Sequence, residues 1–538
     1  MSKEDVKIRM EHCKNYNISG IPVEVETLGH SCSLMVYEKE SILDALMKTD
    51  TSYSAVCGGA GRCGKCKIKL LEGNLPVTES DKQHFTDNEL ERGLRLACRA
   101  YPKESVKVEL LFGMEDEFEI VAEHAQNRTT SIQKQKEGFG IAVDIGTTTI
   151  AMQLISLGSG EIVGTYTALN RQRCFGADVI ARITAAIKGH QEELRELIQE
   201  DLKKGIHSLV RQAEVSTDTV TELAIAGNTT MIHLLMGYDC KGLGSYPFTP
   251  VNIKLIERTY EDVLGDTFLC AKVRILPGIS VFVGGDIVSG LYEQNMDCDK
   301  KYSLLIDFGT NGEIALGNKD KLLVTSTAAG PAFEGGNIRY GVGSVGGAIV
   351  GVTIGDNRTE VKTIADKAPI GICGTGVIEA AAELLRLGLV DETGCMDDLY
   401  FEDGYPLAET SDGSAIYLTQ KDIREIQLAK AAVRAGLETL FLRYGITEEE
   451  VSRVYLAGGF GFNLNCCKAV EIGLLPEELE DKVEIIGNSS LSGAVKCLME
   501  QDGWERVTKL AEGAQEIVLS TDRDFNQLYM EHMGFERR

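Results

Sequence analysis

Four cysteines near the start of the sequence have a spacing that could hold a metal centre. Three of them, Cys57, Cys63 and Cys66, lie in the glycine-rich stretch CGGAGRCGKC, and Cys98 follows in GLRLACRAY. Four thiolates are the usual ligands of a [2Fe–2S] cluster. Glycines let the chain wrap such a cluster with backbone N–H groups directed at sulfur, which tunes its potential. The pattern predicts a [2Fe–2S] cluster on these four cysteines.

Two other interpretations of these cysteines stay open. Zinc ribbons use two Cys-x2-Cys pairs, and only Cys63 and Cys66 have that spacing in this stretch, which disfavours zinc. The thiols could also be buried and unligated, as free cysteines often are. Four cations surround the stretch, and they form either a solvated face or a docking patch for an acidic redox partner. They are Arg62, Lys65, Lys67 and Lys69.

A second set of candidate functional residues lies in an internal repeat of the sequence. GIAVDIGTTTIAMQLI at 140–155 returns as LLIDFGTNGEIALG at 304–317, so Asp144 and Asp307 both end an apolar strand in an Asp-x-Gly-Thr turn. Carboxylates suit hydrated magnesium, and hydroxyls and backbone N–H groups suit phosphate oxygens. The repeat predicts a duplicated pair of α/β lobes, each with one such turn. The alternative is that both are only tight turns.

A third motif, VYLAGGFGFNLN at 454–465, is a strand followed by Gly458 and Gly459. Such a turn lets a base or ribose approach the backbone closely. Together the three motifs resemble the superfamily of sugar and acetate kinases, heat-shock chaperones and actin. The resemblance implies an ATPase in which two hairpins grip the phosphates, their aspartates hold magnesium, and the Gly-Gly turn meets the adenosine of ATP.

The resemblance carries over to individual residues of this sequence. It implies a first phosphate site formed by Asp144, Gly146, Thr147 and Thr148. It implies a second phosphate site formed by Asp307, Gly309, Thr310, Asn311 and Gly312. The adenosine turn would be formed by Gly458 and Gly459.

Further residues follow from the same resemblance. Asp286, in VFVGGDIVSGL, lies where related kinases begin an interlobe helix, and it either acts in catalysis or caps that helix. Residues 228–230 of AIAGNTTM are expected to face the cleft between the lobes. GNSSLSGA at 487–494 is expected to form the second connecting helix, whose small residues permit lobe rotation.

Three more cysteines lie near these motifs. Cys373 in GICGTGVIEAA precedes a Gly-Thr-Gly triplet, as does a cluster ligand in the activators of 2-hydroxyacyl-CoA dehydratases, but its spacing differs. We therefore expect Cys373 not to be a ligand. Cys466 and Cys467 adjoin the adenosine turn and are expected to be small buried residues.

The elements that must position these residues fall into composition zones. Short alternating strands around 23–28, 31–37, 65–71 and 105–111, with a helix at 41–49, predict an α+β, β-grasp-like domain that resembles a ferredoxin. From Gly138 onward, apolar strands alternate with amphipathic helices such as 178–190 and 421–445, which indicates an α/β fold.

The predicted boundaries follow from these zones. We expect a [2Fe–2S] ferredoxin-like domain over 1–113, a polar linker over 114–137, and a two-lobed actin-like ATPase domain over 138–538, with lobe I at about 138–300 and lobe II at about 301–538.

Composition limits the partners. The formal charge of −26 argues against nucleic acid and against anionic membrane surfaces. No apolar run reaches the about 18 residues of a spanning helix, and the first residues lack the apolar centre of a signal peptide. We therefore expect a cytoplasmic protein without nucleic-acid or membrane partners. In that compartment the chain's 15 cysteines point to metal ligation or buried thiols before disulfides.

A ferredoxin domain followed by such an ATPase resembles the reductive activators of corrinoid proteins in anaerobic methyltransferase systems. The resemblance implies ATP-driven transfer of one electron from the cluster to an inactive Co(II) corrinoid protein, which regenerates Co(I). It also implies an upstream low-potential electron donor and a possible homodimer. It further implies, through the family's need for ATP, that the cobalt couple lies below the roughly −400 mV of plant-type clusters, so that the electron transfer is uphill.

Three rival functions stay open at this point. The chain could activate another low-potential metalloenzyme, such as a 2-hydroxyacyl-CoA dehydratase. It could be a kinase with a regulatory cluster, although no sugar-binding motif is visible. It could also be a nucleotide-sensing interaction protein without turnover.

Overall fold

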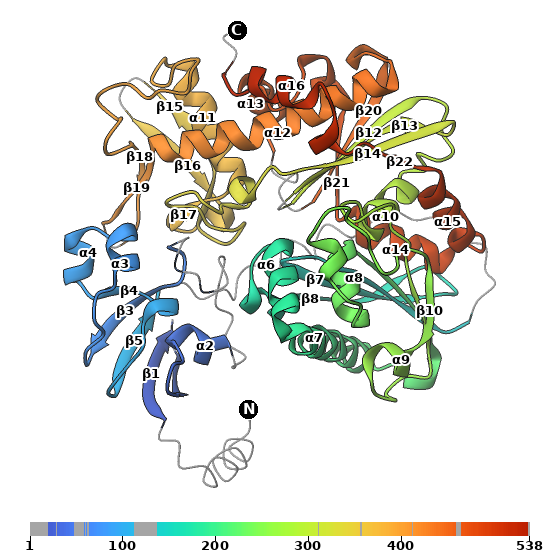
Figure 1. Ribbon diagram of the computed structural model, residues 1–538, viewed down its shortest axis with the longest axis horizontal. Coiled ribbons are helices and arrows are strands. Elements are labelled where there is room, and N and C mark those ends of the chain that lie inside the picture. Colours follow the sequence, from blue (N-terminus) through green and yellow to red (C-terminus); the bar gives the residue numbers. More distant parts are fainter. Residues whose placement is uncertain are drawn as a thin grey trace. The chain divides into compact units, whose positions relative to one another are not determined.

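The computed structural model describes residues 20–27, 30–47, 59, 61, 64–111, 137–309, 311–355, 358–411, 413–458 and 464–535. The chain divides into two compact units (Figure 1), one of Met1–Glu115 with Arg171–Arg182 and one of Asp116–Asn170 with Ile183–Arg538. All but the last residue of the expected linker lies outside the described residues. The domain boundaries on either side of it therefore stay a prediction.

The first unit contains a five-stranded mixed sheet in the order β2-β1-β5-β3-β4. Strand β1 pairs antiparallel with β2 and parallel with β5, and β3 pairs antiparallel with β5 and β4. Alternate residues of the central strands, such as Val23 and Val108, are fully buried, as expected for a half-buried sheet. The strands are β1 (Ile21–Thr27), β2 (His30–Val36), β3 (Lys67–Glu72), β4 (Leu94–Leu96) and β5 (Val106–Leu110).

Among the described residues of this unit, three short helices accompany the sheet: α2 (Ile42–Met47), α3 (Glu79–His84) and α4 (Asp87–Glu91). Helices α3 and α4 both begin at capping boxes, led by Thr78 and Thr86, and such a cap stabilises a helix by about 1 kcal/mol. These two helices and the three-residue β4 lack the long periodic pattern that sequence reasoning depends on, and were not predicted.

The second unit is built on two six-stranded sheets, in the orders β10-β11-β9-β6-β7-β8 and β21-β20-β12-β13-β14-β22. In each sheet, three consecutive strands form an antiparallel meander whose first strand also pairs with a parallel strand. Strand β9 pairs with β6 of the meander β6-β7-β8, and β20 pairs with β12 of the meander β12-β13-β14. The internal repeat thus forms equivalent hairpins in two equivalent sheets. The strands of the first sheet are β6 (Phe139–Ile145), β7 (Thr149–Ser156), β8 (Ile162–Leu169), β9 (Val220–Gly227), β10 (Ile256–Thr259) and β11 (Lys272–Ile275).

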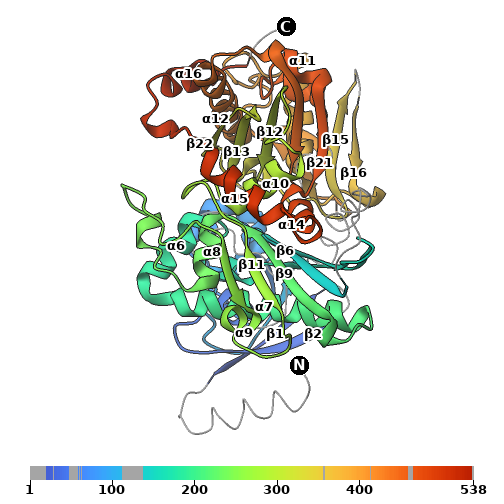
Figure 2. The same cartoon turned by 90° about the vertical axis from the view of Figure 1, so that its right-hand side faces the viewer.

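Three helices lie between these sheets (Figure 2): α10 (Gly285–Glu293), α14 (Ser489–Met499) and α15 (Gly503–Gly513). One apolar cluster joins them to both sheets and includes the buried Ala142 of β6 and Leu305 of β12. The strands of the second sheet are β12 (Tyr302–Phe308), β13 (Gly312–Asn318), β14 (Lys321–Thr327), β20 (Val451–Ala457), β21 (Val483–Gly487) and β22 (Gln515–Glu516).

Two expected helices have different outcomes. The helix expected at 421–445 is α12 (Gln420–Tyr444), which starts at a Thr419–Asp422 capping box and ends at Gly445 in the left-handed region, with a φ of 85°. The helix expected at 178–190 is α6 (Val179–Ala185) and a further turn that breaks at Gly189, with a φ of 108°.

The remaining elements cover these sheets or form small sheets of their own. They are α7 (Gln191–Gln212), α8 (Thr229–Met236), α9 (Tyr260–Leu264), α11 (Gly374–Arg386), α13 (Cys466–Glu471), α16 (Phe525–Glu531), β15 (Ala348–Ile354), β16 (Thr359–Thr363), β17 (Gly371–Ile372), β18 (Tyr405–Glu409) and β19 (Ala415–Leu418). Within the ranges that the structure describes, none of the helices has the length and apolar character needed to cross a membrane.

Candidate functional site

The described part of the cysteine loop brings two of the four predicted cluster ligands together. Cys66 precedes β3, and Cys98 lies in the 3-10 turn Ala97–Arg99 that follows β4. The backbone N–H of Ala97 donates to the carbonyl of Cys66 at 2.7 Å, and the two cysteines are only 3% and 2% exposed. Cys57 and Cys63 lie outside the described residues, so their role stays a prediction.

Three glycines shape the loop beside these thiols. Gly59, Gly61 and Gly64 have φ values of 77°, 72° and 69°, which side chains rarely tolerate. A Cβ on Gly59 would lie 3.9 Å from the Cβ of Cys98, and one on Gly64 would lie 2.8 Å from a ring nitrogen of His84. The buried thiols and a glycine backbone that passes close to them fit a [2Fe–2S] cluster.

The cations near this loop are partly engaged. The Lys67 ammonium lies 5.8 Å from the centre of the Phe85 ring, and Lys69 lies 4.0 Å from Glu109 with both side chains 43% exposed. Arg62 lies outside the described residues. The docking patch therefore stays a prediction.

The first Asp-x-Gly-Thr turn joins β6 to β7. The N–H of Gly146 donates to the carbonyl of Thr149 at 2.9 Å and closes the turn. Asn228, the N-cap of α8, donates from its side chain to the Thr147 hydroxyl at 3.0 Å. Asn170 donates to the Gly146 carbonyl at 2.9 Å. Asn228, which was expected only to face the cleft, thus contacts this turn, and Asn170 was not predicted.

The carboxylate of Asp144, at the end of β6, is held by the start of α14. Asn488 donates from its side chain to one carboxylate oxygen at 2.9 Å, and the Ser490 hydroxyl donates to the other at 2.7 Å. Burial raises the pKa of Asp144, and these two hydrogen bonds act in the opposite direction. Sequence reasoning placed α14 between the lobes but did not assign these contacts.

The second turn joins β12 to β13 and is closed by the Gly309 N–H, which donates to the Asn311 carbonyl at 3.0 Å. Thr310 lies outside the described residues. Asp307 is paired with Glu313 across the hairpin, and the Ser326 hydroxyl donates to Glu313 at 3.2 Å. Glu313 was not predicted, although its place opposite Asp307 follows from a three-residue turn.

Asp286 lies in the first turn of α10, whose N-cap is Gly284. The interpretation of Asp286 as the cap of this helix is therefore wrong. Its carboxylate accepts a hydrogen bond from the Ile287 N–H at 2.9 Å. Burial raises the pKa of Asp286 to about 7, and the nearby charge of Asp144 adds to the shift.

Negative charges converge on the two hairpins. Burial raises the pKa of Asp307 to about 7, with further contributions from Asp286, Asp144 and Glu334. Carboxylates that raise each other's pKa favour a proton or a cation between them. Among the described residues no three acidic, histidine or cysteine side chains converge as direct ligands of one ion.

The turn after β20 meets the second hairpin. Gly458 has a φ of 86°, and a Cβ there would lie 2.6 Å from the Phe308 carbonyl and 2.8 Å from the Asp307 carboxylate. Its N–H donates to the Gly487 carbonyl at 3.1 Å, just before α14. Only glycine fits this approach. Gly459 lies outside the described residues.

The three cysteines near the nucleotide motifs differ in burial. The Cys373 thiol is buried, donates to the Ile349 carbonyl at 3.2 Å and lies 3.1 Å from the Thr375 hydroxyl. Cys466 is half-buried and Cys467 is exposed, so the expectation that both are buried is wrong. They lie at the start of the short α13, whose first turn faces outward at Cys467.

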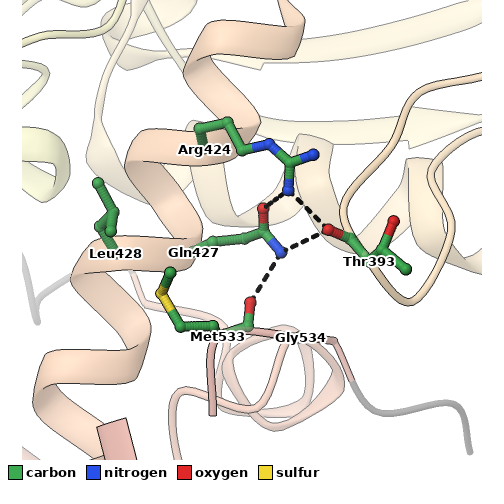
Figure 3. A pocket seen from close by; sticks show the side chains of 6 residues that line it. All are labelled: Thr393, Arg424, Gln427, Leu428, Met533 and Gly534. Carbon is green, nitrogen blue, oxygen red and sulfur yellow. Dashed lines mark hydrogen bonds between the residues drawn. The ribbon is translucent and has the colours of Figure 1, made fainter. Parts of the chain in front are cut away.

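A pocket of about 400 Å³ lies between α12 and the C-terminal segment (Figure 3) and is lined by Thr393, Arg424, Gln427, Leu428, Met533 and Gly534. Arg424 donates to the Thr393 carbonyl at 2.6 Å, and Gln427 donates to the Met533 carbonyl at 2.7 Å. The lining groups bond to one another and anchor the C-terminal segment on α12.

Three family models match consecutive parts of the chain. The 2Fe-2S iron-sulfur cluster binding domain matches residues 26–103, the RACo middle region matches 139–299, and the C-terminal domain of RACo, the ASKHA domain, matches 301–538. These matches confirm the predicted fold class, a ferredoxin-like domain followed by a two-lobed actin-like ATPase fold.

Relatives that match about three quarters of the chain agree with these family matches. The corrinoid activation enzyme RamQ of Eubacterium limosum is 34% identical over 426 residues, which are 75% of this chain and 72% of that protein. The [Co(II) methylated amine-specific corrinoid protein] reductase of Methanosarcina barkeri is 26% identical over 430 residues, 74% of this chain and 77% of that protein. A solved structure of a reductive activator for corrinoid, iron-sulfur protein covers 95% of this chain and 98% of its own, with a TM-score of 0.69 and 27% identity.

Proposed function

The chain belongs to the RACo family of reductive activators of corrinoid proteins, and we propose that it transfers one electron from a [2Fe–2S] cluster to an inactive Co(II) corrinoid protein of a methyltransferase system, with ATP driving the step. The product is the Co(I) corrinoid, and the oxidised cluster is reduced again by a low-potential electron donor. The supporting observation is that one chain combines two buried cysteines beside a glycine loop, Cys66 and Cys98, with paired Asp-x-Gly-Thr hairpins.

The ferredoxin-like unit supplies the ligands for the electron carrier. Cys66 and Cys98, with Cys57 and Cys63, would hold the cluster as thiolates, and the cluster would supply one-electron chemistry. The positive-φ glycines would let backbone N–H groups approach the sulfurs, and such hydrogen bonds tune the potential of a cluster. Burial of the two described cysteines keeps water from the thiolates.

The hairpins of the second unit supply the groups for a nucleotide. Asp144 and Asp307 would hold hydrated magnesium. The turns that follow them would contact the phosphates through hydroxyl and N–H groups, and Gly458 would lie against the adenosine. Asp286, whose pKa is raised to about 7, is suited to orient and deprotonate the attacking water near neutral pH. The phosphate turns comprise Gly146, Thr147 and Thr148 in the first and Gly309, Thr310, Asn311 and Gly312 in the second.

In this proposal the electron passes uphill from a cluster near the roughly −400 mV of plant-type ferredoxins to a cobalt couple that lies lower, and it therefore needs a second energy source. ATP can supply that energy only if the protein has two states with different affinities for nucleotide, and if the same states differ in their effect on the partner. The helices between the two sheets are the elements through which the lobes would change state.

The test is an anaerobic assay with the full-length, cluster-containing protein. The reduced protein is mixed with a Co(II) corrinoid protein, with and without Mg-ATP, and Co(I) is followed by its absorbance. We expect Co(I) to form only with ATP in the wild type and not at all in Asp307→Ala. Formation at full rate and yield without ATP would contradict the coupling.

A further inference from the structure

Both carboxylate oxygens of Asp144, near the end of β6, accept hydrogen bonds from residues at the start of α14. Asn488 and Ser490 donate to Asp144 at 2.9 Å and 2.7 Å. Asn488 is also the N-cap of α14, because its side-chain oxygen accepts the N–H of Leu491 at 2.8 Å. The first hairpin is thereby bonded to a helix from the far end of the chain.

Helix α14 is in turn closely fitted to α10. The Ser289 hydroxyl of α10 donates to the backbone carbonyl of Ser490 at 2.6 Å. A Cβ on Gly290 would lie 2.7 Å from the Ser489 hydroxyl, and a Cβ on Gly493 would clash with the Ser289 carbonyl. With the backbones this close, α14 cannot shift without moving α10 or breaking these contacts.

The next helix, α15, contains the chain's only tryptophan. Trp504 stacks with the guanidinium of Arg274 at 5.2 Å. Arg274 belongs to β11 of the first sheet, where it forms an ion pair with Glu222 at 3.2 Å. Trp504 therefore joins the helices between the sheets to the sheet that bears Asp144, and its emission is sensitive to a change in that stack.

We propose that Asn488 and Ser490 are positioning residues that orient Asp144 and link it to α14, so that Mg-nucleotide at the hairpins changes the packing of α14 and α15. The proposal rests on the proposed function, because it needs a nucleotide at these hairpins. Its physical basis is that a ligand shifts a conformational equilibrium only through interactions that differ between the states. The bonds of Asp144 to α14 are such interactions.

The variants separate positioning from helix stability. Asn488→Asp keeps an effective N-cap but replaces the amide donor by a second carboxylate facing Asp144. Ser490→Ala removes the other donor, and Ser490→Thr restores a hydroxyl at that position. Ser492→Ala is the matched control, a serine of the same helix that is half-buried and outside the bonds to Asp144.

Two readouts are taken on each cluster-containing protein. Equilibrium dialysis with labelled ATP at varied magnesium concentration measures nucleotide binding. The fluorescence emission of Trp504 reports a change in the packing of α14 and α15. Loss of an outer hydrogen bond to a metal-bound carboxylate costs about 10–100-fold in metal affinity. We expect that rise in half-saturating magnesium for Ser490→Ala, a lower half-saturating magnesium for Asn488→Asp because its added carboxylate attracts the cation, and a loss of the emission change at saturation in both. Ser490→Thr and Ser492→Ala are expected to keep the magnesium dependence and the emission change of the wild type.

The outcomes are distinguishable. A wild-type emission change and magnesium dependence in Asn488→Asp and Ser490→Ala would overturn the link. Binding of ATP to the wild type without any change in emission would also overturn it. A wild type that binds no ATP in dialysis would overturn the proposed nucleotide site itself, and the link with it.

Discussion

Asp307 faces Glu313 directly across the second hairpin, whereas Asp144 faces Ala151 at the equivalent place in the first. The repeat is therefore asymmetric in charge. The second hairpin carries a half-buried pair of carboxylates, and the first carries a single carboxylate held by two neutral donors. This asymmetry assigns different chemistry to two hairpins that share the Asp-x-Gly-Thr motif.

The first prediction concerns the effect of the Asp307–Glu313 pair on the stability of the folded protein. Burial, followed by the charges of Asp286 and Asp307, raises the pKa of Glu313 well above its ordinary value. A carboxyl group with a raised folded-state pKa contributes its full stability below the unfolded pKa of about 4.3, and this contribution is lost as pH rises through the folded pKa. Glu313→Gln is neutral throughout that range.

We therefore expect Glu313→Gln to raise the Tm of the nucleotide-free protein at alkaline pH and to change it little near the unfolded pKa. Calorimetry across that range measures the difference. Glu512→Gln, at an exposed glutamate of α15, serves as the control and is expected to leave Tm unchanged throughout. An alkaline Tm that is lower in Glu313→Gln than in the wild type would show that the charged form is stabilising.

A second prediction separates chemistry from binding at Asp286. Positioned general bases contribute about 10²–10⁴-fold to rate, so Asp286→Asn is expected to lower kcat for ATP hydrolysis by about that factor while ATP binding persists. Phosphate release and equilibrium dialysis measure the two quantities. Asp320→Asn, in the exposed turn after β13, is the control. An unchanged kcat in Asp286→Asn would remove Asp286 from catalysis.

The cluster ligands give a third prediction. Cys98→Ser and Cys66→Ser are each expected to lose iron and acid-labile sulfide and to abolish the rhombic S = 1/2 signal of the dithionite-reduced protein. Cys32→Ser, at an exposed cysteine of the same unit, is expected to retain them. Iron analysis and EPR make the comparison. Zinc without iron in the wild type would refute the cluster.

The fourth prediction tests the adenosine turn. Gly458→Ala forces a side chain into the left-handed region, which costs about 1–2 kcal/mol, and places it against the Asp307 carboxylate. Gly388→Ala has a similar φ of 71° but nothing within 4 Å of the new Cβ. Both variants are expected to lose stability, and only Gly458→Ala is expected to lose ATP affinity in dialysis. Equal ATP affinity in the two variants would contradict this assignment.

Sequence reasoning reached the features that are encoded locally. The Asp-x-Gly-Thr repeat identified Asp144 and Asp307 because strand, turn and carboxylate are contiguous. The amphipathic pattern at 421–445 placed α12 to within one residue at each end, where the structure shows the Thr419 capping box and Gly445. The cysteine loop was visible because its glycines and thiols share ten residues, and family models matched both kinds of domain.

The missed residues act through the tertiary structure. Asn488 and Ser490 reach Asp144 across separations of 344 and 346 residues, and no local pattern links such positions. Glu313 required the register of a hairpin whose turn is shorter than that of its repeat. The exposure of Cys467 depended on how a short helix packs, which composition does not determine.

The central claim is that ATP drives the cluster's electron to cobalt, and a single turnover measures it most directly. The protein is reduced, freed of reductant and mixed with a Co(II) corrinoid protein, while EPR follows the cluster and absorbance follows Co(I). We predict that with Mg-ATP the cluster signal is lost in equal amount to the Co(I) formed, and that without ATP neither changes. Co(I) formed without ATP, or without loss of the cluster signal, would contradict the account.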